Sequence, residues 1–239
     1  MHRSQIKCTY LRFAAFSPQW FVLFVGFCLS LLLPAFSRDG FQVAVSEKQL
    51  ATIEAKYKEG GRKRVLDWIQ LISSNQKKSV REKLALVNDF FNQNTLWVSD
   101  YDHYAVTDYW ATPLEMLASG GGDCEDYAIG KYFTLLALSV PMDTLKITYV
   151  KAKNVDPVNQ SHMVLTYYET PAAMPLVLDN LNPEIKLASD RSDLAPVYSF
   201  NGQGLWLAKE RSSGKGVAGG SGKISLWSDV LSRMGKEFE

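Results

Sequence analysis

Cys124 is the residue whose sequence surroundings point most directly to covalent chemistry. It follows three glycines at residues 120–122 and stands at the start of a predicted helix. The thiolate is the reactive form of cysteine, and the positive end of a helix dipole lowers the pKa of a thiol. Backbone N–H groups at a helix start can also stabilise the oxyanion of acyl transfer. Because Asp123 and Glu125 flank Cys124, a nucleophile is favoured over a buried structural cysteine.

A cysteine nucleophile needs a general base, and histidine is the usual one. His162 opens a predicted strand 38 residues after Cys124, and Asp179 follows 17 residues later on the next apolar strand. Neighbouring antiparallel strands can place two such side chains side by side, and an unpaired carboxylate within an apolar strand would be costly to bury. This order predicts a triad of Cys124 as nucleophile, His162 as base and Asp179 as the orienting acid. His103, in an aromatic loop, is the rival base.

Three acids surround the nucleophile, namely Asp123, Glu125 and Asp126. Acids are favoured in the first turn of a helix and Asp is a good N-cap, which accounts for one or two of them. Three carboxylates near a thiol would raise its pKa and oppose its activation. A bound divalent cation would neutralise them, and carboxylate ligands without a Cys/His cluster favour Ca²⁺. The run lacks EF-hand spacing, so a calcium site and simple helix capping remain alternatives on these grounds.

Helical patterns precede strand patterns along the chain. Apolar spacing predicts helices within residues 47–94, where Gly60-Gly61 ends the first of them, a short helix at 113–117 and a longer one from Asp123. Residues 95–112 are aromatic and irregular, which predicts a packed loop. From residue 145 the apolar pattern predicts strands at 145–151, 162–168, 176–181, 197–200 and 204–208. This order indicates an α+β fold in which one main helix packs against an antiparallel sheet.

The first 37 residues differ from the rest of the chain. Three basic residues and no acid precede an apolar run of 13 residues, Phe21–Leu33, and a small-x-small sequence follows at 35–37. This layout is typical of a secretory signal peptide, with an uncleaved membrane anchor as the alternative. Removal of residues 1–37 leaves 23 basic and 25 acidic residues, a net charge of −2, and a single cysteine, Cys124. An exported chain with one thiol cannot form an internal disulfide.

Composition and charge limit the remaining choices. The full chain has 239 residues, of which 46% are hydrophobic and 21% charged, which is ordinary for a globular protein. Its formal net charge of +1 argues against a dedicated nucleic-acid binder. We expect a folded domain at residues 38–208, soluble once exported, and a tail at 209–239. That tail comprises a glycine- and serine-rich linker at 212–222 and a short final helix at 223–238.

The segment GGGDCEDYAIGKY at residues 120–132 resembles the bacterial transglutaminase-like cysteine proteinases of the LapG type. The resemblance spans about residues 85–208. Four further segments carry it, namely DYWATP at 108–113, HMVL at 162–165, LVLDNL at 176–181 and YSFN at 198–201.

The resemblance implies a papain-like, transglutaminase-type fold and a calcium-dependent periplasmic protease. Such a protease clips the N-terminal region of a very large surface adhesin at an Ala-Ala-Gly type site, which releases the adhesin and lets cells leave a biofilm. An inner-membrane receptor that senses cyclic di-GMP would hold the protease inactive through its own periplasmic domain. Carried over by position, the roles are Cys124 nucleophile, His162 base, Asp179 orienter, Asp123 and Glu125 calcium ligands, and Asp126 bystander or third ligand.

Two other functions fit the same residues. An amine that attacks the thioacyl intermediate would make the chain a transglutaminase, and water that attacks a glutamine-derived intermediate would make it a deamidase. In a non-enzymatic alternative, the three acids bind calcium to order an aromatic docking surface formed by Tyr101, Tyr104, Tyr109 and Trp110, and Cys124 is incidental.

Overall fold

The computed structural model describes residues 41–153, 160–208 and 220–237. The predicted signal peptide at 1–37 and most of the predicted linker at 212–222 lie outside these residues. The chain divides into two units, residues 1–38 and 39–239, and the described residues all belong to the second. Throughout the described ranges, no helix combines the length and the apolar character that crossing a bilayer requires.

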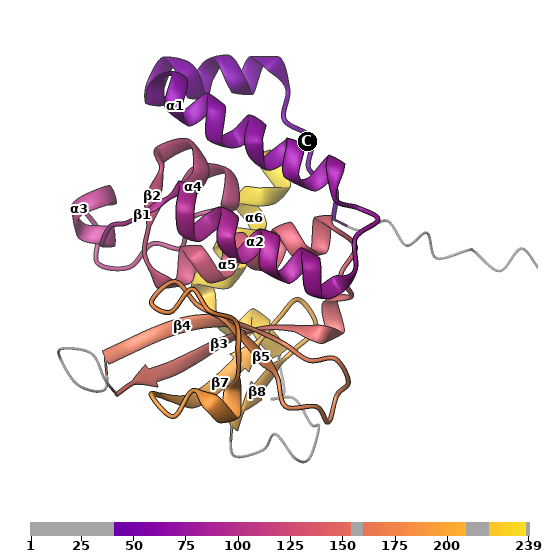
Figure 1. Ribbon diagram of the computed structural model, residues 1–239. Coiled ribbons are helices and arrows are strands. Elements are labelled where there is room, and N and C mark those ends of the chain that lie inside the picture. Colours follow the sequence, from indigo (N-terminus) through magenta and orange to yellow (C-terminus); the bar gives the residue numbers. More distant parts are fainter. Residues whose placement is uncertain (1–40, 154–159, 209–219, 238–239) are drawn as a thin grey trace, which may run out of the picture. The chain divides into compact units, whose positions relative to one another are not determined.

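Helices occupy the first part of this unit, and strands follow them (Figure 1). The first part comprises α1 (Glu47–Ser74), α2 (Val80–Asn94), β1 (Leu96–Trp97), α3 (Asp100–Tyr104), α4 (Pro113–Ser119), β2 (Gly121–Gly122) and α5 (Cys124–Ala137). The second comprises β3 (Leu145–Ala152), β4 (Gln160–Tyr167), β5 (Leu176–Leu178), β6 (Lys186–Leu187), β7 (Leu194–Phe200), β8 (Leu205–Leu207) and α6 (Ser225–Glu237). This order confirms the predicted α+β class.

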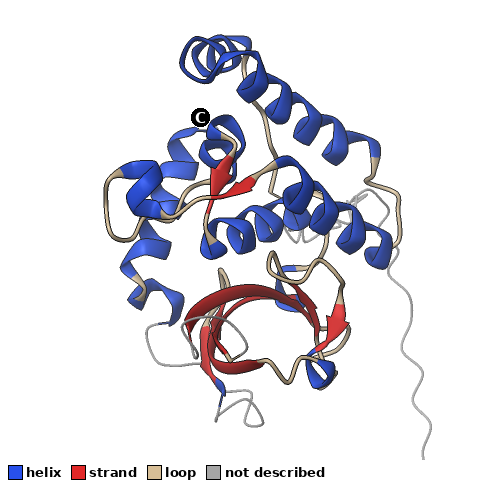
Figure 2. Cartoon of the chain, turned by 60° about the vertical axis from the view of Figure 1, so that its left-hand side comes forward, coloured by secondary structure: helices blue, strands red, loops and turns tan. Residues whose placement is uncertain are grey.

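The strands after α5 form a six-stranded sheet in the order β6-β5-β4-β3-β7-β8, and each neighbouring pair is antiparallel. Figure 2 shows that this sheet is strongly curved and that the main helices lie on one side of it. The register sets Leu165 of β4 opposite Leu178 of β5. The sequence did not predict β6, because its two residues are too short to show an apolar alternation.

Helix α5 forms the centre of the core, and most of its residues are buried. Gly130 allows α2 to approach closely, because a Cβ there would lie 2.5 Å from the ring of Phe91. On α1, the indole Nε1 of Trp68 donates a hydrogen bond of 2.7 Å to Thr134 Oγ1. The opposite side of α5 packs on β3 and β4. Because helices pack on one side of α5 and strands on the other, the first residue of α5 has a fixed position.

Two of the predicted boundaries differ from the structure. The break predicted at Gly60-Gly61 lies two residues earlier, because α1 consists of two helices that meet at a kink at Lys58, with φ 65° and ψ −173°. Gly61 also allows close packing, since a Cβ there would lie 2.5 Å from the carbonyl oxygen of Ala118 on α4. The predicted loop at 95–112 contains the short helix α3, whose N-cap is Ser99.

The predicted final helix, α6, packs into the core. In the structure α6 buries Trp227, whose ring stacks on Phe133 of α5 at a centroid distance of 5.5 Å. The same indole meets Phe200 of β7 edge to face at 5.3 Å. Helix α6 therefore closes the core between α5 and the sheet.

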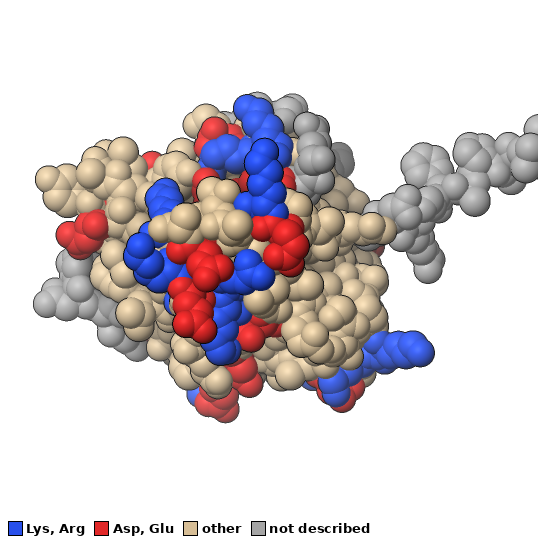
Figure 3. Space-filling view, turned by 90° about the horizontal axis from the view of Figure 1, so that it is seen from above, with Lys and Arg blue, Asp and Glu red and all other residues tan. Residues whose placement is uncertain are grey.

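Charges of both signs mix on the surface that α1 contributes to. In Figure 3, basic and acidic side chains lie next to one another on this face. Ion pairs of α1 include Arg62 with Glu47 at 3.1 Å and Lys63 with Asp67 at 2.6 Å. On the face in view, such mixing is typical of a solvated surface and not of a basic nucleic-acid site.

Candidate active site

Four of the predicted chemical residues line a cleft of about 650 Å³ between the start of α5 and the sheet. Cys124 and His162 both line it, as do Asp123 and Glu125. Aromatic side chains form much of the remaining wall, namely Trp97, Trp110, Tyr149 and Tyr198. A cleft that combines apolar walls with a few polar groups is typical of a ligand-binding or catalytic site.

The backbone around Cys124 is fixed by a two-residue parallel ladder between β1 and β2. Asp126 reaches back over this turn, where its Oδ1 accepts a hydrogen bond from Ala111 N at 2.6 Å and its Oδ2 one from Asp123 N at 3.2 Å. A Cβ at Gly122 would overlap the Asp126 carboxylate, so glycine is required there. The result is a half-buried thiol on the first residue of α5, at the positive end of its dipole.

His162 and Asp179 form a buried hydrogen-bonded pair. His162 Nε2 lies 2.8 Å from Asp179 Oδ1, and their exposed fractions are 4% and 1%. Asp179 Oδ1 also accepts the backbone N–H of Leu181 at 3.0 Å. The structure thus brings together the two strand residues that the sequence paired, although Asp179 lies just after β5 and not within it.

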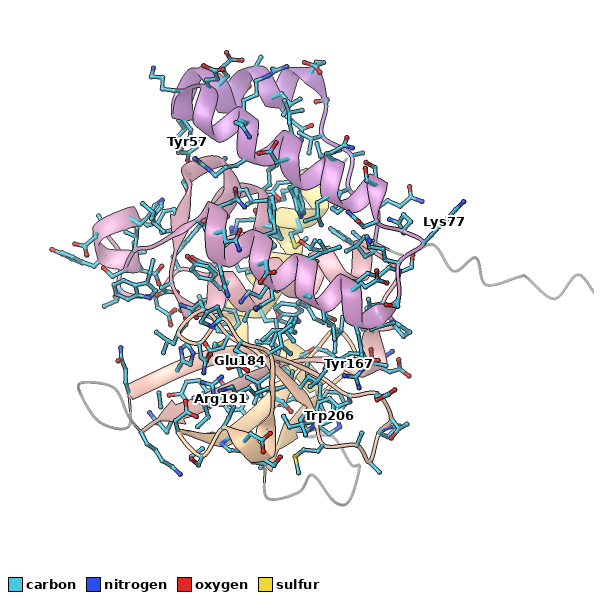
Figure 4. The ribbon with its side chains drawn as sticks, in the orientation of Figure 1. Tyr57, Lys77, Tyr167, Glu184, Arg191 and Trp206 are labelled. Atoms are coloured by element: carbon cyan, nitrogen blue, oxygen red, sulfur yellow. The ribbon has the colours of Figure 1, made fainter. Side chains whose placement is uncertain are left out.

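Arg191 is a further member of this group that the sequence reasoning did not find. Its Nη2 donates to Asp179 Oδ2 at 2.6 Å and to Asp193 Oδ2 at 2.8 Å. Figure 4 shows Arg191 among the strands of the sheet. No local signal in the sequence could have found it, because the arginine precedes β7 and reaches Asp179 only through the folded sheet.

The thiol of Cys124 faces negative charge. Its Sγ donates to Glu125 Oε2 at 2.9 Å. Burial, and then the carboxylates of Glu125 and Asp123, raise the pKa of Cys124 well above its ordinary value. The backbone N–H of Met163, next to His162 on β4, acts in the opposite direction. With these carboxylates uncompensated, the thiolate is therefore disfavoured.

Two further acids join the predicted three. Ligand oxygens lie within 4.8 Å of one another in the group Asp100, Asp123 and Asp126, and also in the group Asp100, Asp108 and Glu125. Burial first, and then its acidic neighbours, raises the pKa of Asp123 to about 10. Burial raises that of Asp100 to about 6. Asp100 Oδ1 and Asp123 Oδ1 are buried without a hydrogen-bond partner among the described residues.

The cluster therefore has the chemistry of a cation site. Its donors are carboxylate oxygens, the ligands that Ca²⁺ prefers. Sequence reasoning missed Asp100 and Asp108 because the irregular segment that carries them gave no indication of where it folds. The DYWATP segment that begins at Asp108 was the one available signal.

His103, the rival base, lies elsewhere. Its ring stacks on Tyr104 at a centroid distance of 4.4 Å, and burial lowers its pKa. It is not among the residues that line the cleft. Because His162 lines the cleft together with Cys124 and His103 does not, the geometry favours His162 as the base.

Comparison with known proteins agrees with this arrangement. The family model described as bacterial transglutaminase-like cysteine proteinase BTLCP matches residues 67–197. The chain belongs to this family. This cysteine proteinase is 45% identical to a solved structure of Legionella pneumophila LapG, which covers 80% of this chain and 98% of that one with a TM-score of 0.66.

Two further LapG structures from the same organism match over a similar length. One is EGTA-treated, with 45% identity, coverage of 80% and 98% and a TM-score of 0.68. The other is calcium-bound, with 44% identity, coverage of 80% and 99% and a TM-score of 0.66. A comparison of this cysteine proteinase with curated proteins finds no match.

The buried Asp179 predicts a pH-dependent contribution to the stability of this cysteine proteinase. Burial raises its pKa, but hydrogen bonds from His162 and Arg191 outweigh this and lower it to about 2. The unfolded value is about 4, so the carboxylate stabilises the fold by roughly 2 kcal/mol above pH ~4, and this is lost as pH falls towards 2. Urea unfolding is expected to show Asp179→Asn less stable than wild type at pH 6, with the gap narrowing below pH ~4.

The exposed Asp190 offers a matched control for this measurement. Asp190→Asn removes the same charge without touching the buried pair, so its stability should stay close to that of wild type at each pH. A constant gap between wild type and Asp179→Asn from pH 6 to the acid limit would contradict the prediction.

Proposed function

We propose that this chain is a calcium-dependent cysteine endopeptidase in which Cys124, His162 and Asp179 form the catalytic triad. The observation that carries the proposal is the buried His162–Asp179 pair at 2.8 Å, next to a cleft that also holds the helix-start thiol. A nucleophile, a base and a group that orients the base are the three parts that covalent acyl transfer needs.

The hydrogen bonding suggests which nitrogen moves the proton. Because Nε2 of His162 bonds to Asp179, Nδ1 is the nitrogen left to take the proton of the Cys124 thiol. The thiolate then attacks the peptide carbonyl, and the imidazolium returns the proton to the leaving amine. Water hydrolyses the thioacyl enzyme with His162 again as base. The first N–H groups of α5 have no intrahelical acceptor, so they are available to the oxyanion.

A calcium ion fits the acidic cluster. Asp123 and Glu125, with Asp100, Asp108 and Asp126, supply carboxylate oxygens, and two of these are buried without a partner among the described residues. The ion would supply positive charge beside Cys124. In support, a relative of 44% identity is described as calcium-bound. Asp126 already accepts two backbone hydrogen bonds, so Asp123 and Glu125 are the stronger ligands.

Substrate, partner and location follow from kinship with LapG. The substrate would be the N-terminal region of a large surface adhesin, cut in the periplasm after export by the signal segment at 1–37. Release of the adhesin would promote biofilm dispersal. A cyclic di-GMP-sensing inner-membrane receptor would inhibit the enzyme through its periplasmic domain. The support is a 45% identity that covers 98% of a LapG chain.

Mass spectrometry of a recombinant N-terminal adhesin fragment, incubated with the purified protein and Ca²⁺, tests the proposal. A single cut is expected, and the receptor's periplasmic domain should prevent it. Conversion of a glutamine to glutamate without a cut would indicate a deamidase, and an amine-linked product a transglutaminase. Either result, or an unchanged fragment, would overturn the endopeptidase.

A further inference from the structure

Lys131 is a buried cation that the proposed mechanism does not use. It lies seven residues after Cys124 on α5, which is two helical turns along a similar face. Its exposed fraction is 1%, and its Nζ has no hydrogen-bond partner within the part of the chain that the structure describes. Burying an ammonium without a direct partner costs free energy, so a lysine here needs an explanation.

The segment that holds Asp179 is bound to α2, and α2 packs on α5, the helix that carries Lys131. On α2, Asn92 Nδ2 donates to the carbonyl oxygen of Asp179 at 2.9 Å, and Asn88 Nδ2 donates to that of Pro183 at 2.8 Å. These two hydrogen bonds connect the segment after β5 to α2, and α2 packs on α5. The side-chain oxygens of Asn88, Asn92 and Asn180 are buried acceptors without a partner among the described residues.

Charges facing Lys131 come from several elements. Asp179, after β5, and Asp89, on α2, both raise the pKa of Lys131, but burial outweighs them and lowers it to about 7. On α5 itself, the ring of Tyr127 lies 5.7 Å from Nζ, and burial raises the pKa of that phenol, so it stays neutral. On the sheet side, His162 and Arg191 bind the two oxygens of Asp179.

We propose that Lys131 is a positioning residue of the triad, whose buried ammonium holds the Asp179 turn from the α5 side and so keeps His162 aligned with Cys124. Arg191 supplies positive charge to the same carboxylate from the segment before β7. An apolar side chain would fill this place in the core without the cost of desolvation, and replacing a buried charge with one is often neutral or stabilising. Buried titratable groups with perturbed pKa values cluster at functional sites.

Two observables separate positioning from a structural role. If Lys131 only filled the core, Lys131→Met would change activity in step with stability. If it positions the triad, Lys131→Met should keep or raise the melting temperature while kcat falls roughly tenfold and KM stays within twofold, because the lysine does not touch substrate. Since Lys131 loses its charge near neutral pH, wild-type kcat should also decline above pH ~7. Lys131→Arg, which stays charged, should retain more activity there.

The experiment uses the calcium-loaded protein and rests on the proposed function. Melting temperature, adhesin-fragment kinetics and the rate of Cys124 alkylation by iodoacetamide are measured for wild type, Lys131→Met and Lys131→Arg from pH 6 to 9. Alkylation reports on the thiol and its base without any protein substrate. If the wild-type protein cuts no fragment, the proposed function is wrong, and the alkylation rates still test the role of Lys131. Unchanged alkylation and kcat in Lys131→Met, or losses matched by instability or misfolding, would overturn the positioning role.

Discussion

Replacing Cys124 with serine is expected to lower the rate of cleavage by at least roughly 10⁴-fold, with the fold unchanged. The half-buried thiol is the proposed nucleophile, and a serine hydroxyl in the same place is far harder to deprotonate. Because the exchange of sulfur for oxygen is nearly isosteric, the melting temperature should change little. The measurement is kcat/KM on the adhesin fragment, with circular dichroism as the folding check.

The two histidines of the described chain provide a matched pair for the base. His162→Gln should lose activity on the same scale as Cys124→Ser, because the ring buried against Asp179 is the proposed base. His103→Gln should retain nearly full activity, because His103 stacks on Tyr104 and is absent from the cleft lining. Loss of activity in His103→Gln, with His162→Gln active, would reverse the assignment.

Chelation of calcium with EGTA is expected to reduce cleavage by at least roughly 100-fold and to lower the melting temperature. Without a cation, the carboxylates of Asp123 and Glu125 face each other and the thiol, and Glu125 accepts a hydrogen bond from Cys124 Sγ. Added Ca²⁺ should restore both properties. Undiminished cleavage in EGTA would rule out a calcium requirement.

Single substitutions localise the calcium effect. Asp123→Asn should need much more Ca²⁺ for half-maximal activity, since it removes one charge from the centre of the cluster. Asp143→Asn is the matched control, because Asp143 is exposed in the turn before β3 and belongs to none of the acidic groups found in the described chain. Calcium titrations that coincide for Asp123→Asn and wild type would place the ion elsewhere.

The sequence predicted those parts of the fold and site that local chemistry determines. A helix that starts at Cys124 follows from the glycines before it, and the pairing of His162 with Asp179 follows from two neighbouring apolar strands. Asp100, Asp108 and Arg191 were missed because each joins the site only through tertiary packing. The two-residue strands β1, β2 and β6 were also missed, since so short a segment carries no periodicity.

Gly61 shows that a glycine can have a second role that the sequence does not indicate. Gly60-Gly61 predicted the end of a helix, and the kink lies two residues earlier at Lys58, but Gly61 also brings α1 against the Ala118 carbonyl of α4. A sequence pattern reports the conformational freedom of glycine, and close packing depends on what the fold places opposite it.

The stacking of Trp227 has a consequence for where the chain can be truncated. The family match ends at residue 197, yet α6 beyond it covers Phe133 and Phe200 and donates hydrogen bonds from Arg233 to Glu115 and the carbonyl oxygen of Trp110. Trp110 in turn lines the cleft. The C-terminal helix thus supports the wall of the cleft at Trp110. We expect truncation after residue 197 to expose the apolar side chains that α6 covers and to loosen this wall.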